Sequence, residues 1–243
     1  MRLDKFLANE NIGSRKAVGV LVRSGAVTVN GQAVKKADMQ VDPACDTVCV
    51  NGAPVRYNAH TYIMMNKPAG VLTATRDSRA ETVLDLLPPA LKRRGLFPAG
   101  RLDKDTTGLL ILTDDGDYAH RMLAPKSHVM KRYEAVLDRP AEAADKTRFA
   151  AGIRSGEDCF APALLEISPA DPHTVWVEIR EGKFHQVKRM FRACGKTVTA
   201  LRRLSIGALR LDPALGPGEA RVLSEKEAML VFEKKPEQFD RKV

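Results

Sequence analysis

The stretch Gly100–Leu110 places one acidic side chain among cations and glycines. Asp103 has Arg101 two positions before it and Lys104 directly after it, with a glycine near either end. Neighbouring cations favour the ionised form of a carboxylate, which is the form that can attack carbon, and glycines let the backbone approach a ligand closely. The stretch therefore indicates nucleophilic chemistry at Asp103, and the plain alternative is a polar loop with local ion pairs.

Metal or cofactor chemistry is not indicated by the sequence. The carboxylates that could suggest a metal site are Asp103, Asp105, Asp114 and Asp115. Their spacing fits no EF-hand, and the adjacent Arg and Lys argue against a hard cation. The cysteines are Cys45, Cys49, Cys159 and Cys194, with no CxxC pair among them. The absence of a P-loop disfavours phosphoryl transfer, so we expect no metal and no small-molecule cofactor.

The segment 180–210 is strongly basic, with nine Lys and Arg against one acidic residue. If His185–Cys194 is a helix, its apolar side chains line one face, which is most simply core. The opposite face carries His185, Lys188, Arg189, Arg192 and Lys196. Like charges three and four positions apart repel each other, and an anionic partner would relieve that repulsion. This pattern favours nucleic acid as the partner over a basic surface kept for solubility.

The N-terminal residues predict a small basic α/β unit over 1–56. We expect a short helix over 3–11 and a second helix that begins after Ser14 as N-cap, with its cations on one face. A strand at Val27–Val29 leads into Asn30-Gly31, a strong hairpin signal, and Lys35 and Lys36 are expected on the return strand.

The rest of the chain predicts a larger α+β domain over 61–235, after a linker at 57–60 and before a charged tail at 236–243. The strands expected there are Tyr62–Met65, Leu109–Thr113, Tyr133–Leu137, Ala163–Ile167, Val175–Arg180 and Leu209–Leu211. The helices expected there are Val83–Leu87, Tyr118–Leu123, Ala141–Ala151, His185–Cys194 and Glu225–Phe232. The start of the chain has no apolar signal core, and no apolar run is long enough to span a membrane. We therefore expect free thiols, a cytoplasmic location and no membrane partner.

The first unit resembles an S4 RNA-binding module. The matching residues are Arg2–Leu7, Ser14–Ala17 and Gly25–Gly31, in that order. The RNA-contact candidates in this unit are Arg2, Lys5, Arg15, Lys16, Arg23, Lys35 and Lys36. Such a surface binds RNA backbone and shape rather than sequence, and the alternative is a solvated helix face.

The second domain resembles the pseudouridine synthases of the RsuA/RluA superfamily. The string Gly100–Leu110 is similar to their catalytic motif, and Asn66–Gly70, Lys131–Tyr133 and Glu181–Met190 are similar to three further family segments in the expected order. The resemblance implies that Asp103 is the nucleophile, that Tyr133 lies against the target base, and that Lys188 pairs with Asp103. Phosphate contacts are then expected from Arg101, Arg189, Arg192 and Lys196, and His185 is a further candidate for contact with RNA.

The resemblance also implies a fold and a reaction. The fold is α+β, an S4-like module followed by a catalytic domain with a central mixed β-sheet flanked by helices. The reaction is isomerisation of uridine to pseudouridine in bacterial small-subunit ribosomal RNA, at uridine 516, by a monomer whose partner is ribosomal RNA or a small-subunit assembly intermediate. The alternatives are the same chemistry on large-subunit RNA and a non-catalytic assembly factor that binds ribosomal RNA.

Overall fold

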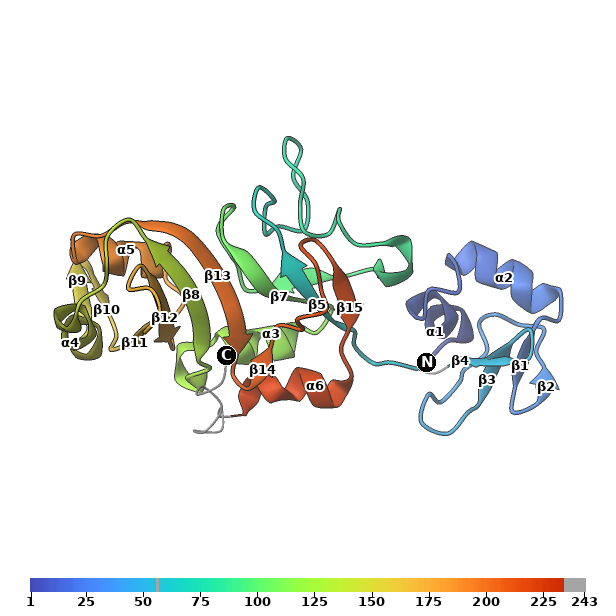
Figure 1. The fold of residues 1–243 in the computed structure, drawn as a ribbon. Coiled ribbons are helices and arrows are strands. Elements are labelled where there is room, and N and C mark those ends of the chain that lie inside the picture. The colour runs from blue at the N-terminus through green and yellow to red at the C-terminus, as the bar shows by residue number, and fades with distance from the viewer. Residues whose placement is uncertain (56, 234–243) are drawn as a thin grey trace. The chain divides into compact units, whose positions relative to one another are not determined.

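The computed structural model describes residues 1–55 and 57–233 of the 243-residue chain. The charged tail predicted at 236–243 lies outside the described residues. The chain divides into two compact units, Met1–His60 with Lys92–Gly95, and Thr61–Leu91 with the chain from Leu96 onward. Both units combine helices and strands, so the α+β class is confirmed (Figure 1). No helix among the described residues is long and apolar enough to cross a membrane.

The first unit packs two helices, α1 (Leu3–Asn9) and α2 (Arg15–Arg23), against a small antiparallel sheet. The sheet has the order β2-β1-β3-β4, formed by Gln32–Ala33, Val27–Val29, Val48–Val50 and Ala53–Val55. The Ser14 side chain accepts a hydrogen bond from the Ala17 amide at 3.2 Å, so the predicted N-cap is confirmed. Apolar faces of both helices pack with the strands in one core.

The hairpin predicted at Asn30-Gly31 is also present, with both residues in the left-handed conformation that such a turn requires. Two details differ from the prediction. Helix α1 ends at Asn9 rather than residue 11, because Asn11 has a φ of 60° and cannot continue a right-handed helix. Strand β2 ends at Ala33, so Lys35 and Lys36 follow the return strand instead of lying on it.

The second unit is built on one mixed sheet with the order β11-β12-β8-β13-β7-β5-β15. These strands are Leu164–Ile167, Thr174–Ile179, Lys131–Leu137, Val198–Ile206, Thr107–Thr113, Tyr62–Lys67 and Ala220–Val222. Strands β6 (Phe97–Ala99) and β14 (Leu209–Arg210) add to it, beside β7 and β13. The β13–β7 pair is parallel, and its described neighbours along the sheet are antiparallel. Strands β9 (Ile153–Ser155) and β10 (Asp158–Phe160) form a separate hairpin.

Helices cover both faces of this sheet, as Figure 1 shows, because the side chains of its strands alternate between two cores. On β5, Ile63 and Met65 belong to the core that includes residues of α4 (Ala143–Ala151) and α5 (Gln186–Ala193). Tyr62 and Met64 belong to the core that includes residues of α3 (Gly116–Leu123) and α6 (Glu225–Met229). Three short 3₁₀ turns, Pro89–Leu91, Pro125–Ser127 and Leu230–Phe232, complete the described helical segments.

One predicted element of this unit is wrong, and five strands were not predicted: β6, β9, β10, β13 and β15. Val83–Leu87 forms turns rather than a helix: two prolines follow it, and the Asp85 carboxylate binds the Thr82 amide and hydroxyl at 2.8 Å. The longest of the omitted strands is β13, the central strand Val198–Ile206, whose adjacent arginines interrupt its apolar character.

Candidate active site

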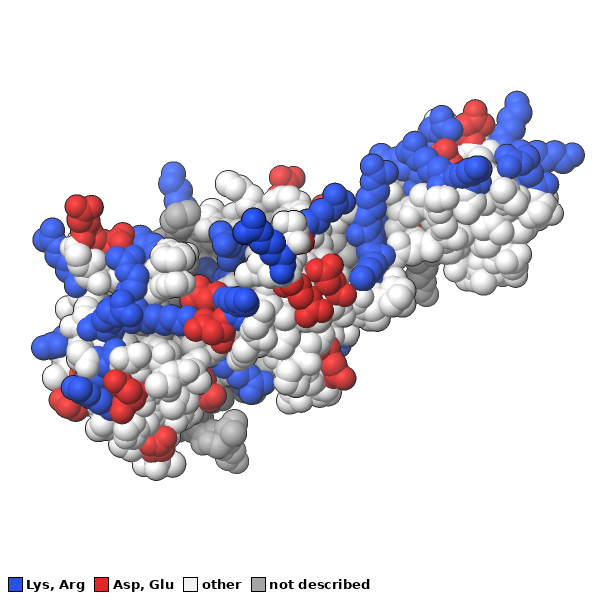
Figure 2. Space-filling view, turned by 90° about the horizontal axis from the view of Figure 1, so that it is seen from above, with Lys and Arg blue, Asp and Glu red and all other residues white. Residues whose placement is uncertain are grey.

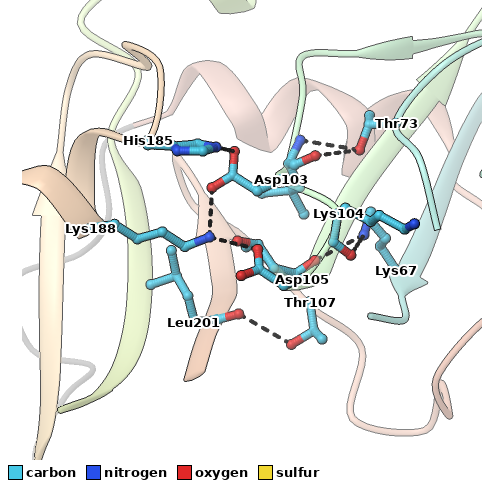
Figure 3. Close-up of polar contacts among 11 residues, drawn as sticks. Lys67, Thr73, Asp103, Lys104, Asp105, Thr107, His185, Lys188 and Leu201 are labelled. Carbon is cyan, nitrogen blue, oxygen red and sulfur yellow. Dashed lines mark hydrogen bonds and ion pairs between the residues drawn. The ribbon is translucent and has the colours of Figure 1, made fainter. Parts of the chain in front are cut away.

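The loop that carries Asp103 is held in place by hydrogen bonds from a buried lysine. Lys67, at the end of β5, is fully buried, and its Nζ donates to the carbonyl oxygens of Pro68, Lys104 and Thr106 at 2.9, 3.2 and 3.0 Å (Figure 3). Burial lowers the pKa of this lysine to about 8. The carbonyls of Lys104 and Thr106 converge on this ammonium, which fixes the backbone on the C-terminal side of Asp103.

A second tie holds the loop on its N-terminal side. The Thr73 hydroxyl donates to the Leu102 carbonyl at 2.7 Å, and the Leu102 amide donates to the Thr73 hydroxyl oxygen at 3.3 Å. These contacts join the segment after β5 to the residue directly before Asp103 (Figure 3). The Asp103 backbone is therefore held on both sides by groups from elsewhere in the fold.

The Asp103 carboxylate faces two basic groups from the start of α5. Lys188 Nζ lies 3.0 Å from Asp103 Oδ2, and His185 Nε2 lies 3.4 Å from Oδ1 (Figure 3). Lys188 also donates to Asp105 Oδ1 at 2.6 Å, so one ammonium serves two carboxylates. The pairing of Lys188 with Asp103 that the family resemblance implies is present, and the contact with Asp105 was not foreseen.

The charges of this cluster reinforce one another. The hydrogen bond from Lys188 holds the pKa of Asp105 below its usual range, against the opposing effect of burial. Burial lowers the pKa of Lys188, but its hydrogen bonds to Asp105 and Asp103 outweigh that effect and raise it above the ordinary value. The lysine is thus a permanent cation at neutral pH, and only 22% of its side chain is exposed.

Helix α5 presents this cation because its apolar side is buried. Val187, Met190 and Phe191 pack into the core, so Lys188 points away from it toward the Asp103 loop. His185 precedes the helix with a φ of 49°, a left-handed conformation uncommon for a residue other than glycine. This conformation turns the chain so that both basic side chains reach the same carboxylate.

A small pocket opens beside Asp103, with Tyr133 as its aromatic wall. Tyr133, on β8, is 7% exposed. The other lining residues include Leu102, Asp103, Thr106, Ile179, His185, Val187 and Leu201. An ionised carboxylate, a tyrosine ring and apolar walls suit a flat, weakly polar group such as a nucleobase, brought next to a nucleophile.

One row of residues across the sheet supports the pocket. Cross-strand partners run from Tyr133 on β8 to Arg203 on β13, then to Gly108 on β7 and Lys67 on β5. Gly108 has a φ of 99°, and a Cβ there would collide with the Arg203 backbone, so glycine permits the close approach of β7 and β13. The row therefore fixes the positions of Tyr133, the start of β7 and Lys67 relative to one another.

Arg203 is a site residue that sequence reasoning missed. Its side chain is 3% exposed, its Nε donates to the Leu109 carbonyl at 2.8 Å, and its Nη1 lies 3.5 Å from the Tyr133 hydroxyl. Leu201, Arg203 and Ser205, at alternate positions of β13, are all buried, so Arg203 lies on the inward side of the strand. A charged residue at an inward position of a strand marks a group with a specific partner.

Comparison with known proteins agrees with this geometry. Residues 61–193 match the family model described as RNA pseudouridylate synthase, and residues 1–48 match the S4 domain. The chain belongs to the RNA pseudouridylate synthase family. Its second unit is therefore that of an isomerase that makes pseudouridine, and its first is an S4 domain.

Individual relatives extend over nearly the whole chain. An uncharacterized RNA pseudouridine synthase of Bacillus subtilis is 49% identical and covers 96% of this chain and 99% of its own. The ribosomal small subunit pseudouridine synthase A of Escherichia coli K12 is 42% identical over 93% of this chain and 98% of its own. A crystal structure of a pseudouridylate synthase, 36% identical, has a TM-score of 0.66 and covers 95% of this chain and 99% of its own.

Within this family framework, the cations predicted around Asp103 differ in their roles. Arg101 and Lys104 are exposed, and neither forms an ion pair with Asp103 in the described structure. Lys188 forms that ion pair instead, and His185 lies beside the same carboxylate. Arg192 is exposed on α5, where a phosphate could reach it. Arg189 pairs with Asp158 and lies over the Phe160 ring, so it braces the β9–β10 hairpin in this structure.

The position predicted for Lys196 on an exposed basic stripe is wrong. Helix α5 ends at Ala193, and the chain turns inward, so Lys196 is 8% exposed. Its Nζ forms an ion pair with the buried Asp145 at 2.8 Å. A buried cation paired with a buried carboxylate is part of the fold, and the side chain in this position cannot reach a phosphate.

The cations predicted for RNA contact in the S4 domain are all exposed: Arg2, Lys5, Arg15, Lys16, Arg23, Lys35 and Lys36. Arg2 also forms an ion pair with Asp4 at 3.0 Å. Figure 2 shows Lys and Arg gathered along one side of this unit, with uncharged residues over most of its remaining visible face. Among the described residues of the chain, no group of three or more His, Cys, Asp or Glu could hold a metal ion.

Proposed function

We propose that this protein isomerises a uridine of bacterial small-subunit ribosomal RNA to pseudouridine, with Asp103 as the nucleophile. The observation that carries the proposal is the Asp103 carboxylate, held 3.0 Å from the Lys188 ammonium beside a pocket walled by Tyr133. The choice of RNA rests on the relatives named ribosomal small subunit pseudouridine synthase A, such as that of Vibrio cholerae at 40% identity over 96% of this chain.

The reaction exchanges one bond for another within a single nucleotide. The N-glycosidic bond between N1 of uracil and the ribose breaks, the base turns, and C5 bonds to the ribose in place of N1. The proton lost from C5 is balanced by the proton gained at N1, so no electron, phosphate or external group is transferred. The residues named below therefore need to bind and orient the base, supply a nucleophile and relay a proton.

The roles of the site residues follow from their positions. Asp103 attacks carbon in its ionised form, and Lys188 keeps that carboxylate ionised and oriented. Tyr133 stacks on the uracil, an interaction worth about 1–3 kcal/mol for a single base, and its hydroxyl relays a proton. The target uridine must leave the RNA stack to enter the pocket, which implies base flipping.

The basic surfaces divide the binding of RNA between them. The exposed cations of the S4 domain dock structured RNA through backbone and shape, and Arg101 and Arg192 hold phosphates of the target strand. In this proposal the protein works as a monomer in the cytoplasm, without metal or cofactor, on ribosomal RNA or a small-subunit assembly intermediate. Within this proposal, the target nucleotide in the small-subunit RNA is uridine 516.

Mapping of pseudouridine in ribosomal RNA from cells with and without the gene tests the proposal. We expect one pseudouridine of the small-subunit RNA to disappear, and to return when the wild-type gene is restored but not when Asp103→Asn is. Asp117→Asn, at an exposed carboxylate on α3, is the matched control and should restore it. Loss of a large-subunit pseudouridine instead would overturn the choice of RNA, and full recovery by Asp103→Asn would overturn the nucleophile.

A further inference from the structure

Phe184 is an exposed aromatic side chain beside the active site. Of the large hydrophobic residues that the structure describes as exposed, it has the highest exposed fraction, 74%, and the next highest is 54% at Val20. It lies in the turn between β12 and α5, directly before His185. Exposure of an aromatic ring to water is unfavourable, so an exposed ring beside an active site indicates contact with a binding partner.

The Phe184 ring is supported from one side. It stacks on the His185 ring with centroids 3.8 Å apart and an interplanar angle of 18°. His185 in turn directs its Nε2 toward the Asp103 carboxylate at 3.4 Å. The two rings therefore form a shelf that starts at the nucleophile and extends into solvent.

The turn that carries the shelf is held in place by its neighbours. The Lys183 amide donates to Gln186 Oε1 at 3.1 Å, and Lys183 Nζ donates to the Cys159 carbonyl on the β9–β10 hairpin at 2.6 Å. Gln186 Nε2 donates to Glu181 at 3.1 Å, which closes the turn on itself. An aromatic ring presented on a braced turn needs little reorganisation to bind a flat ligand.

We propose that Phe184, backed by His185, stacks on a nucleobase of the substrate RNA that neighbours the target uridine. The target base itself belongs in the pocket beside Tyr133. His185 lines that pocket, whereas Phe184 is not among its lining residues and covers the His185 ring. When the target uridine leaves the RNA stack, its neighbour loses a stacking partner, and an exposed ring at the pocket entrance replaces it. Phe184 is thus a positioning residue for the flipped state of the RNA.

This inference rests on the proposed function, and its test separates the two. The substrate is first fixed as the ribosomal RNA fragment that the wild-type enzyme converts, so a wrong choice of ribosomal subunit is detected before any variant is made. The fluorescent base 2-aminopurine then replaces the nucleotide on either side of the target uridine. Binding of wild-type protein should quench one of these two probes by stacking.

The variants distinguish stacking by an aromatic ring from contact with any apolar side chain. We expect Phe184→Ala to weaken RNA binding by about 5- to 150-fold, the range that loss of one base stack produces, and to abolish the quenching. Phe184→Leu should keep most of the apolar surface and still lose the quenching, whereas Phe184→Trp should retain both affinity and quenching. Leu164→Ala, an exposed apolar residue on β11 with 51% exposure, is the matched control and should change neither.

Three outcomes would overturn the inference. They are a Phe184→Ala variant with wild-type affinity, unchanged quenching at both probe positions in that variant, and full recovery of both properties by Phe184→Leu. Because the Phe184 ring is mostly outside the core, these substitutions leave the fold intact, and circular dichroism verifies this. At saturating RNA, the single-turnover rate of Phe184→Ala should stay closer to wild type than its affinity does.

Discussion

Replacement of Lys188 by methionine is the sharpest test of the carboxylate cluster. The side chain keeps a similar length but loses the ammonium that lies 3.0 Å from Asp103 and 2.6 Å from Asp105. The two carboxylates then share a small space without their common cation. Their mutual repulsion favours displacement of the Asp103 side chain from its position in the site, and this lowers the fraction of molecules ready to attack.

The size of the effect follows from the geometry. A hydrogen bond to a charged group contributes about 1.5–3 kcal/mol, and the 22% exposure of the Lys188 side chain places this pair toward the lower end, at about 1.5–2 kcal/mol. Since each 1.36 kcal/mol changes a rate tenfold, Lys188→Met should slow the chemical step by about 10- to 30-fold. The loss should appear in the rate at saturating RNA, with a smaller change in affinity.

Single-turnover measurement of pseudouridine formation checks this value. The double variant Lys188→Met/Asp105→Asn should recover part of the lost rate, because it removes one of the two competing negative charges. Lys146→Met, at an exposed lysine on α4, makes the same change of charge away from the site and should behave as wild type. A wild-type rate for Lys188→Met at saturating RNA, or no recovery in the double variant, would refute the reasoning.

Three further predictions concern neighbouring groups. Tyr133→Phe should lower the rate by about 10²–10⁴-fold if its hydroxyl, 3.5 Å from Arg203 Nη1, relays a proton, and near wild-type turnover would exclude that role. Lys67 keeps its proton in the unfolded chain up to about pH 10.5 but releases it near pH 8 when folded. The free energy of unfolding of wild type should therefore rise from pH 8 to 10.5 relative to Lys67→Met, by at most about 3 kcal/mol, in denaturant titrations. Lys196→Met leaves Asp145 buried and unpaired and should cost about 3–5 kcal/mol of stability without changing RNA affinity at a temperature where the variant is folded; a selective loss of affinity would restore Lys196 as an RNA contact.

Much of the fold could be predicted from the sequence because local signals agree with it. Ser14 before a periodic apolar pattern marks the start of α2, and Asn30-Gly31 marks the first hairpin. The apolar side of the segment after His185 predicts α5, and its burial orients Lys188. Such features are set within a few residues of the chain, so one sequence is enough to find them.

The missed features depend on contacts between distant segments. Arg203 is buried because its strand lies between β8 and β7, and no local pattern shows that the Leu109 carbonyl will accept from it. Lys196 points inward because the chain turns after Ala193 toward Asp145, about fifty residues earlier in the sequence. The same reason explains Lys67, because two of its three carbonyl partners, Lys104 and Thr106, lie in a loop that meets it only in the folded sheet.

The parallel β13–β7 pair lies in the middle of the central sheet, and we call the line between these two strands the seam. Its two registered residue pairs, Arg202 with Thr107 and Arg203 with Gly108, join two parts of the sheet. One part contains β7, β5 and β15 and adjoins the Asp103 loop, and the other contains β8 and β12, with α5 beside it. Asp103 belongs to one side of the seam, and Lys188 and His185 belong to the other. A molecule bound between them bridges the two sides, so its binding free energy is also free energy that opposes separation of the strands. Slower hydrogen exchange of the backbone amides along β7 and β13 would thus report occupancy of the pocket without any measurement of turnover.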